Sequence, residues 1–350
     1  MKLRGMRHRP VRHVPAYEDR QGGGARPVSP AIVALECALA SDGASALDPR
    51  VPASVWRRAL VGPAAEFLAR PGKALRTTIV QAGWLLGGGA RDGMPERLPL
   101  VIEILHAGSL IIDDVQDGSA DRRGAPTLHR LVGVPLAINT GSWMYFWALA
   151  ELGQLGLPPA TELAAHRAAA TTLVRCHQGQ ALDLATRIGE LARDEVAAVV
   201  AATTRLKTGV LCRFAAELGA LTAGAPPATR AAIASFGEAM GIGLQMLDDL
   251  GSLTSAARRD KGREDLRERR PTWPWAWLSE DPDAFARLVA LDDIEAIADA
   301  LASQVGAIGR TRIRDTLDSA LAELVRAVGN SPVIEMIAAE LRRMENSYGC

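Results

Sequence analysis

The chain has 350 residues, in which 40 lysines and arginines balance 40 aspartates and glutamates, and 48% of the residues are hydrophobic. This balance gives no general attraction to nucleic acid or to an anionic membrane, so any phosphate-binding site has to be local. No apolar run reaches the roughly 18 residues of a membrane span. The basic start Met1–Arg12 has no apolar segment after it, and the cysteines lack metal-ligand spacing. We expect a cytoplasmic protein with no transmembrane segment and no nucleic-acid partner.

The first 28 residues are rich in arginine, proline and glycine and cannot bury enough apolar surface to fold alone. We predict a disordered leader over 1–28 and one helical domain over 29–350. From Pro30 onwards, apolar residues recur at helical spacing. Breaks rich in glycine, proline or polar residues fall at 41–53, 87–95, 118–126, 156–159, 224–227 and 255–274. About ten helices and no period-two strand result, which predicts an all-α fold built as one large helical bundle.

The helix expected over 96–117 ends in an acidic cluster, Asp113-Asp114-Val115-Gln116-Asp117. Asp113 and Asp117 are four residues apart and so share one helical face. The helix dipole disfavours negative charge at this end by about 0.3–1 kcal/mol per group, so cations should offset it. Oxygen ligands at this density suit Mg²⁺, which keeps waters and bridges to a substrate phosphate. By spacing alone, a solvated acidic helix end is an equal alternative.

Two adjacent arginines, Arg122 and Arg123, follow this cluster within the turn Gly118–Gly124. The turn is expected to return them to the acidic helix end, and guanidinium groups bind phosphate with two parallel hydrogen bonds. Metal ligands beside phosphate-binding arginines predict a diphosphate site.

A second acidic cluster lies near the end of the helix expected over 228–250. Gln245, Asp248 and Ser252 share one helical face there, and Asp249 follows Asp248. A charged loop carrying Lys261 comes next and ends near Pro274. The comparable pair at 292–293 lacks phosphate-binding neighbours, and we interpret it as a helix start or cap.

Over approximately residues 30–345 the chain resembles the trans-isoprenyl diphosphate synthase (polyprenyl synthetase) family, and most of all its geranylgeranyl diphosphate synthases. Ordered motifs carry the resemblance: Pro71-Gly72-Lys73-Ala74-Leu75-Arg76, His106 with Ser109–Asp114, the arginine turn, Gly179–Leu184, Lys207-Thr208 and the second acidic pair. The family implies an isoprenoid-synthase-type bundle with a central active-site cavity, a homodimer, and about three Mg²⁺ ions per active site.

The resemblance also implies roles for single residues. The catalytic residues would be Asp113, Asp114, Asp117, Lys207 and Asp248. The metal ligands would be Asp113, Asp117, Asp183, Asp248, Asp249 and Ser252, with Gln180 in support. The allylic diphosphate would be bound with the help of Arg122, Lys207 and Lys261, and the diphosphate of isopentenyl diphosphate by Lys73, Arg76, His106 and Arg123, with Thr208 and Gln245 also at the substrate site. Because Ser252 stands where many members carry a third aspartate, Asp249 and Ser252 are expected to bind metal weakly or through water.

Product length is expected to depend on Gly108 and Ser109, which precede Asp113 by about one helical turn. In the resembling family, bulky aromatic residues here give shorter products, so small residues imply products of about twenty carbons or more. The alternative is that these small residues only permit close helix packing.

The favoured function is chain elongation, in which isopentenyl diphosphate is added to an allylic diphosphate. The runner-up is a class I terpene cyclase on the same scaffold, which would ionise farnesyl or geranylgeranyl diphosphate to a hydrocarbon. A third alternative is a regulatory subunit without catalysis, and the intact Asp113–Asp117 cluster with its arginines speaks against it.

Overall fold

A computed structural model describes residues 30–40, 47–70, 75–255 and 259–347. The leader predicted over 1–28 and Lys73 lie outside these residues. The described part is almost entirely helical with one short hairpin, which confirms the all-α prediction. It divides into two compact units, one made of residues up to 74 with 100–156, the other of residues 75–99 with those from 157 onwards.

The first unit holds α1 (Pro30–Ala40), α2 (Ala53–Trp56), the π-helical turn η1 (Arg57–Val61), α3 (Gly62–Leu68), nearly all of α5 (Leu98–Gln116), β1 (Asp121–Arg122), β2 (Ala125–Pro126), α6 (Leu128–Val132) and α7 (Val134–Leu152). The second unit holds α4 (Leu75–Leu86), α8 (Pro159–Ala185), the 3-10 turn η2 (Ile188–Glu190), α9 (Arg193–Thr204), the π-helical turn η3 (Arg205–Gly209), α10 (Val210–Thr222), α11 (Pro227–Thr254), α12 (Arg259–Arg267), α13 (Trp273–Leu278), α14 (Pro282–Val289), α15 (Ile294–Val328) and α16 (Pro332–Ser347).

In the first unit, α5 and α7 cross at backbone contact. A Cβ atom added at Gly108 would lie 2.7 Å from the carbonyl oxygen of Gly141 and 3.0 Å from Cβ of Met144. A Cβ atom added at Gly141 would lie 3.0 Å from the carbonyl oxygen of Gly108. Two glycines facing each other therefore allow the helices to approach this closely. The crossing supports the end of α5 that carries the first acidic cluster.

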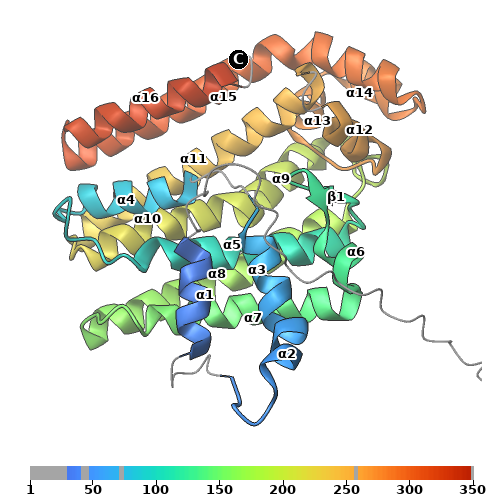
Figure 1. Ribbon diagram of the computed structural model, residues 1–350. Coiled ribbons are helices and arrows are strands. Elements are labelled where there is room, and N and C mark those ends of the chain that lie inside the picture. Colours follow the sequence, from blue (N-terminus) through green and yellow to red (C-terminus); the bar gives the residue numbers. More distant parts are fainter. Residues whose placement is uncertain (1–29, 41–46, 71–74, 256–258, 348–350) are drawn as a thin grey trace, which may run out of the picture. The chain divides into compact units, whose positions relative to one another are not determined.

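In the second unit, α10 forms the centre of the core. It packs against α4, α8 and α11, and α11 packs in turn against α15 (Figure 1). Cβ atoms added at Gly83 and Gly219 would each lie 2.2 Å from a carbonyl oxygen of the opposite helix, so α4 and α10 also touch through their backbones. The long α11 is thereby held on two sides, and it carries the second acidic cluster.

One helix end and one additional helix differ from the prediction. The helix expected to end at 250 continues to Thr254, and α12 forms inside the expected loop over 255–274. The side chain of Arg263 on α12 is 4% exposed and binds both carboxylate oxygens of Glu295 on α15. A tertiary ion pair of this kind stabilises a helix that apolar periodicity does not reveal. The interpretation of 292–293 is confirmed, because Asp293 caps α15 by accepting from the backbone N–H groups of Glu295 and Ala296.

No helix within the described ranges is long and apolar enough to cross a membrane.

Candidate active site

The first acidic cluster lies where α5 ends. The Asp113 side chain is 19% exposed, Asp114 is 1% exposed, and Asp117 is partly exposed just beyond the helix. The backbone N–H of Asp117 donates to the carbonyl of Asp113, so the chain keeps its helical course up to Asp117. Asp113 and Asp117 are therefore the members of this cluster that can meet a ligand from solvent, and Asp114 points into the interior.

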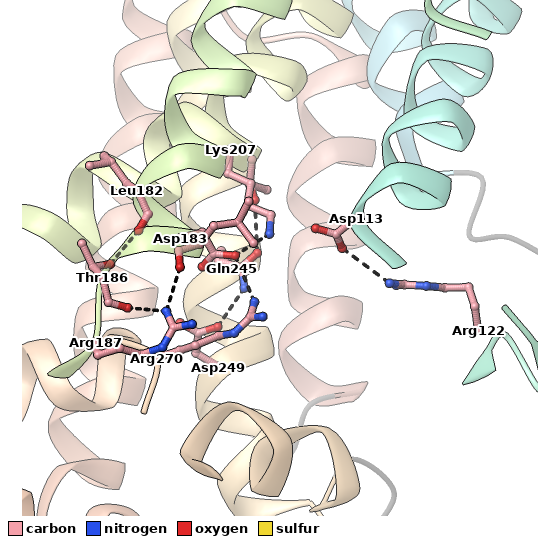
Figure 2. A network of polar contacts seen from close by, with 12 residues as sticks. Asp113, Arg122, Leu182, Asp183, Thr186, Arg187, Lys207, Gln245, Asp249 and Arg270 are labelled. Atoms are coloured by element: carbon pink, nitrogen blue, oxygen red, sulfur yellow. Dashed lines mark hydrogen bonds and ion pairs between the residues drawn. The ribbon is translucent and has the colours of Figure 1, made fainter. Parts of the chain in front are cut away.

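Arg122 lies against this cluster. Its Nε donates to Oδ1 of Asp114 at 2.7 Å. Figure 2 shows its contact with Asp113, in which Nη2 lies 3.5 Å from Oδ2. Burial raises the pKa of Asp114, and the ion pair with Arg122 only partly opposes this rise. Burial is the largest single influence on Arg122 and acts to lower its pKa. The hydrogen bond to Asp114, together with the negative charges of Asp114, Asp113 and Asp117, outweighs it, so the pKa lies above its ordinary value. The guanidinium is thus a fixed positive charge beside Asp113.

The arginine turn is the β1–β2 hairpin, with Arg122 paired to Ala125 and Asp121 paired to Pro126. Its central residues Arg123 and Gly124 both have positive φ, 57° and 78°, which is the pattern of a type I′ turn. The guanidinium carbon of Arg123 lies 5.9 Å from the ring centroid of Phe67, which is fully buried. The sequence-based expectation that this turn brings an arginine back to the acidic cluster is confirmed for Arg122.

In the second unit, Asp183 on α8 binds two cationic side chains (Figure 2). Lys207 Nζ donates to Asp183 Oδ2 at 2.7 Å, and Arg270 Nη1 donates to the same oxygen at 3.1 Å. The side chain of Asp183 is 15% exposed, that of Lys207 is 32% exposed and that of Arg270 is 13% exposed. The negative charge of Asp183 is therefore shared by two cations, and Lys207 keeps part of its surface open to a ligand.

Lys207 and Thr208 lie in the π-helical turn η3, which interrupts an otherwise continuous α9–α10 helix. Extra backbone residues of this kind often re-aim side chains at functional sites. Gly179 on α8 allows the turn to come close, because a Cβ atom added there would lie 2.5 Å from the backbone nitrogen of Lys207. The neighbouring Gln180 is half-buried on the same helix.

The second acidic cluster on α11 is connected to η3 and α13. Thr208 donates to the Gln245 side chain at 3.1 Å, and Gln245 donates to Oδ1 of Asp249 at 2.8 Å. The other oxygen of Asp249 accepts from the backbone N–H of Trp273 at 3.0 Å. Both oxygens of Asp249 thus bind protein groups and hold the start of α13 in place. Asp248 is half-buried on α11.

Ser252 is buried, at 5% exposure, and its hydroxyl donates to the backbone oxygen of Asp249. A Cβ atom added at Gly262 on α12 would lie 2.4 Å from the Ser252 carbonyl oxygen, so α12 packs directly on this residue. Metal binding by Asp249 and Ser252 stays a prediction, and the observed contacts give both residues a packing role.

The remaining predicted residues have less defined surroundings. His106 is half-buried on α5. Arg76 on α4 has a buried Nε with no hydrogen-bond partner in the part of the chain that the structure describes. Lys261 belongs to α12, but its side chain lies outside what the structure describes, as does all of Lys73.

Gly108 lies where α5 and α7 touch. A Cβ atom added there would point at the backbone of α7, which favours the alternative of close helix packing. Its influence on product length stays a prediction. Ser109 is half-buried on α5, and its hydroxyl donates to the carbonyl oxygen of His106.

Among the described residues, no three histidine, cysteine, aspartate or glutamate side chains lie close enough to hold a metal ion. Mg²⁺ does not require such a group, because it usually binds one or two carboxylates together with waters and substrate phosphates. Asp113 and Asp117, which are spaced by one helical turn and partly exposed, fit that donor set.

Comparison with known proteins adds to this geometry. The sequence profile of the polyprenyl synthetase family matches residues 57–296. The chain belongs to this family. A geranylgeranyl pyrophosphate synthase 2 from Zymoseptoria tritici is 33% identical over 219 residues, which is 61% of this chain and 63% of that protein. The chain thus spans about six tenths of the length of the curated relatives it matches.

Solved structures of polyprenyl synthetases share the fold. Heptaprenyl diphosphate synthase from Staphylococcus aureus aligns with a TM-score of 0.74 at 19% identity, covering 90% of this chain and 96% of that one. A polyprenyl synthase from Caulobacter crescentus, solved in complex with calcium and isoprenyl diphosphate, aligns with a TM-score of 0.68 at 21% identity, covering 93% and 98%. At these identities the likeness shows the fold alone, and it agrees with the helical bundle expected from sequence.

Proposed function

We propose that this polyprenyl synthetase condenses isopentenyl diphosphate with an allylic diphosphate to a longer trans-prenyl diphosphate, with geranylgeranyl diphosphate as its main product. The observation that carries the proposal is the fixed cation beside a metal-type carboxylate pair: Arg122, held by buried Asp114, lies next to Asp113. A site that draws electrons toward a departing diphosphate needs this combination. The resemblance to proteins named geranylgeranyl pyrophosphate synthases points to the twenty-carbon product.

In this proposal Asp113, Asp117 and Asp248 would hold about three Mg²⁺ ions per site, which would supply positive charge for the leaving diphosphate. Arg122 and Lys207 bind the same diphosphate. Asp183 orients Lys207, and Gln180 and Lys261 support them. Arg76, His106, Arg123 and Lys73 bind the diphosphate of isopentenyl diphosphate, and the apolar helix faces keep water away from the allylic cation. The calcium and isoprenyl diphosphate of the Caulobacter relative support this assignment.

Terpene cyclisation is the second candidate. The sequence feature that favours it is Ser252, which stands where many family members carry a third aspartate. The Ser252 hydroxyl is buried and bound to a backbone oxygen, which weakens this support because the residue is not presented to a ligand. The cationic residues Arg76 and Arg123 also favour elongation, since a second diphosphate needs its own positive charges.

The expected homodimer is part of the proposal. On α8, Leu163 and Val174 are 51% and 60% exposed, and on α7, Ile138 and Phe146 are 43% and 70% exposed. Each unit thus has exposed apolar residues on one long helix, which is typical of a surface that another chain covers. Light scattering after size-exclusion chromatography should give twice the mass of one chain. A cytoplasmic location is likewise proposed.

A panel of incubations tests the function. The purified chain with Mg²⁺ is given dimethylallyl, geranyl or farnesyl diphosphate, each with and without isopentenyl diphosphate, and the products are analysed by mass spectrometry. Elongation predicts longer diphosphates only where isopentenyl diphosphate is present. Hydrocarbons formed from an allylic diphosphate alone would replace this proposal with cyclisation.

A further inference from the structure

Arg70 lies two residues beyond the end of α3, directly before the Pro71-Gly72-Lys73 segment, and its side chain is 5% exposed. A buried guanidinium is costly unless its donors are used. Its Nη1 donates to the carbonyl oxygen of Arg122 at 3.1 Å and its Nη2 to that of Pro126 at 2.6 Å. Nη2 also donates to both carboxylate oxygens of Glu66 at 2.9 Å. One side chain therefore binds both strands of the arginine turn and the end of α3.

The turn that Arg70 binds has a conformation that needs support. Arg123 has a left-handed backbone, at φ 57°, which is sterically unfavourable for a residue with a side chain. Such conformations persist when the surrounding structure holds them in place. Phe67 provides a second support, because the guanidinium carbons of Arg70 and Arg123 lie 5.3 Å and 5.9 Å from its ring centroid.

We infer that Arg70 is a positioning residue for diphosphate binding: it fixes the backbone of the arginine turn, and with it the placement of Arg123, for isopentenyl diphosphate. This inference rests on the proposed function. Arg122 and Arg123 depend on Arg70 to different degrees. The side chain of Arg122 binds Asp114, at 2.7 Å from Nε to Oδ1. Arg123 packs on the Phe67 ring and occupies the left-handed position of the turn, so its placement follows the backbone that Arg70 holds.

The Arg70→Lys variant tests the inference, because a single ammonium cannot reach two carbonyl oxygens and a carboxylate at once. We expect the KM for isopentenyl diphosphate to rise about tenfold and the KM for the allylic diphosphate to rise less than about threefold. Binding of isopentenyl diphosphate alone, measured by calorimetry, should weaken by a similar factor. Arg50→Lys is the matched control, because this arginine pairs with Asp48 on the surface and its side chain is 88% exposed. The KM values for isopentenyl diphosphate and for the allylic diphosphate should both equal those of the parent.

Two measurements keep the inference apart from general destabilisation and from the proposed function. Hydrogen exchange over residues 119–127 should become faster in Arg70→Lys and not in Arg50→Lys, whatever reaction the protein catalyses. A folded Arg70→Lys variant with parental exchange over 119–127 overturns the inference, and so does one that loses turnover with both KM values unchanged. If Arg70→Lys does not fold, Glu66→Gln replaces it, because it removes the charge that orients Arg70. Glu66→Gln should show the same changes in hydrogen exchange and in KM. Parental hydrogen exchange and KM values in this variant overturn the inference equally. If the parent protein makes no prenyl diphosphate, but exchange over 119–127 becomes faster in Arg70→Lys as expected, only the proposed function is contradicted.

Discussion

Asp113 and Asp114 are neighbours in the sequence with different surroundings. Asp113 is partly exposed beside Arg122, whereas Asp114 is buried and binds the guanidinium of the same arginine. A metal ion and a substrate phosphate can approach the first carboxylate. The second stabilises the arginine from inside the protein.

Replacing each aspartate by asparagine should separate these roles. Asp113→Asn should lower turnover at least about a hundredfold, because it weakens a metal ligand, and change the free energy of unfolding by less than about 0.5 kcal/mol. Asp114→Asn should lower the free energy of unfolding by about 1–3 kcal/mol, because Arg122 loses its buried counter-ion. Urea denaturation and steady-state kinetics measure both. Asp113→Asn as the more destabilised variant would contradict the assignment.

Cys176 gives a prediction about alkaline pH. Burial raises the pKa of its thiol from 9.0 to about 12. Above pH 9 the thiol ionises in the unfolded chain and stays neutral in the folded one, so its contribution to stability is kept below pH 9 and lost as the pH rises toward 12. The free energy of unfolding should fall by up to about 1.4 kcal/mol per pH unit more in the parent than in Cys176→Ala. Parallel stability curves of the two proteins between about pH 9 and pH 10.5 would show that the thiol is not buried in this way.

At the scale of elements, close helix approaches set the positions of the functional side chains. Gly179 lets α8 meet the π-helical turn that presents Lys207 to Asp183, and Gly108 with Gly141 brings α7 against the helix of Asp113. Each approach leaves no room for a methyl group. The placement of these side chains is therefore sensitive to small changes in the backbone packing.

Gly179→Ala should push α8 away from η3, since the new Cβ would lie 2.5 Å from the Lys207 nitrogen. We expect a loss of about 1–3 kcal/mol in the free energy of unfolding, together with weaker binding of the allylic diphosphate. Gly189→Ala is the matched control, because a Cβ added there meets nothing within 4 Å and the residue lacks a positive φ. Equal stability of the two variants would contradict the close approach.

Product length should respond to Ser109 on α5. Ser109→Phe is expected to shift the products toward farnesyl or geranyl diphosphate, because an aromatic ring would shorten the space for the growing chain. Gly108→Ala should lower stability by about 1–3 kcal/mol through the contact with Gly141. Chromatography of the products measures the shift in product length, and urea denaturation measures the loss of stability. An unchanged product distribution in folded Ser109→Phe would remove Ser109 from the product channel.

For the whole molecule, the sequence predicted the helical class, the family and the turn that returns Arg122 to Asp114, since helical periodicity and short motifs are local signals. It did not predict α12, which depends on the pairing of Arg263 with a glutamate about thirty residues away. It also missed Arg70, because a lone arginine beside a proline has no informative spacing. The packing of Gly108 on α7 could not be derived for a related reason: the sequence shows a small residue but not the helix that it faces.

The most direct test of the central claim is the product formed from farnesyl diphosphate and isopentenyl diphosphate in the presence of Mg²⁺. We expect geranylgeranyl diphosphate, whose formation stops with excess chelator and returns when Mg²⁺ is restored. Two results would contradict elongation by this enzyme. In the first, farnesyl diphosphate is consumed in a metal-dependent reaction while isopentenyl diphosphate stays unused. In the second, the chelator does not reduce turnover.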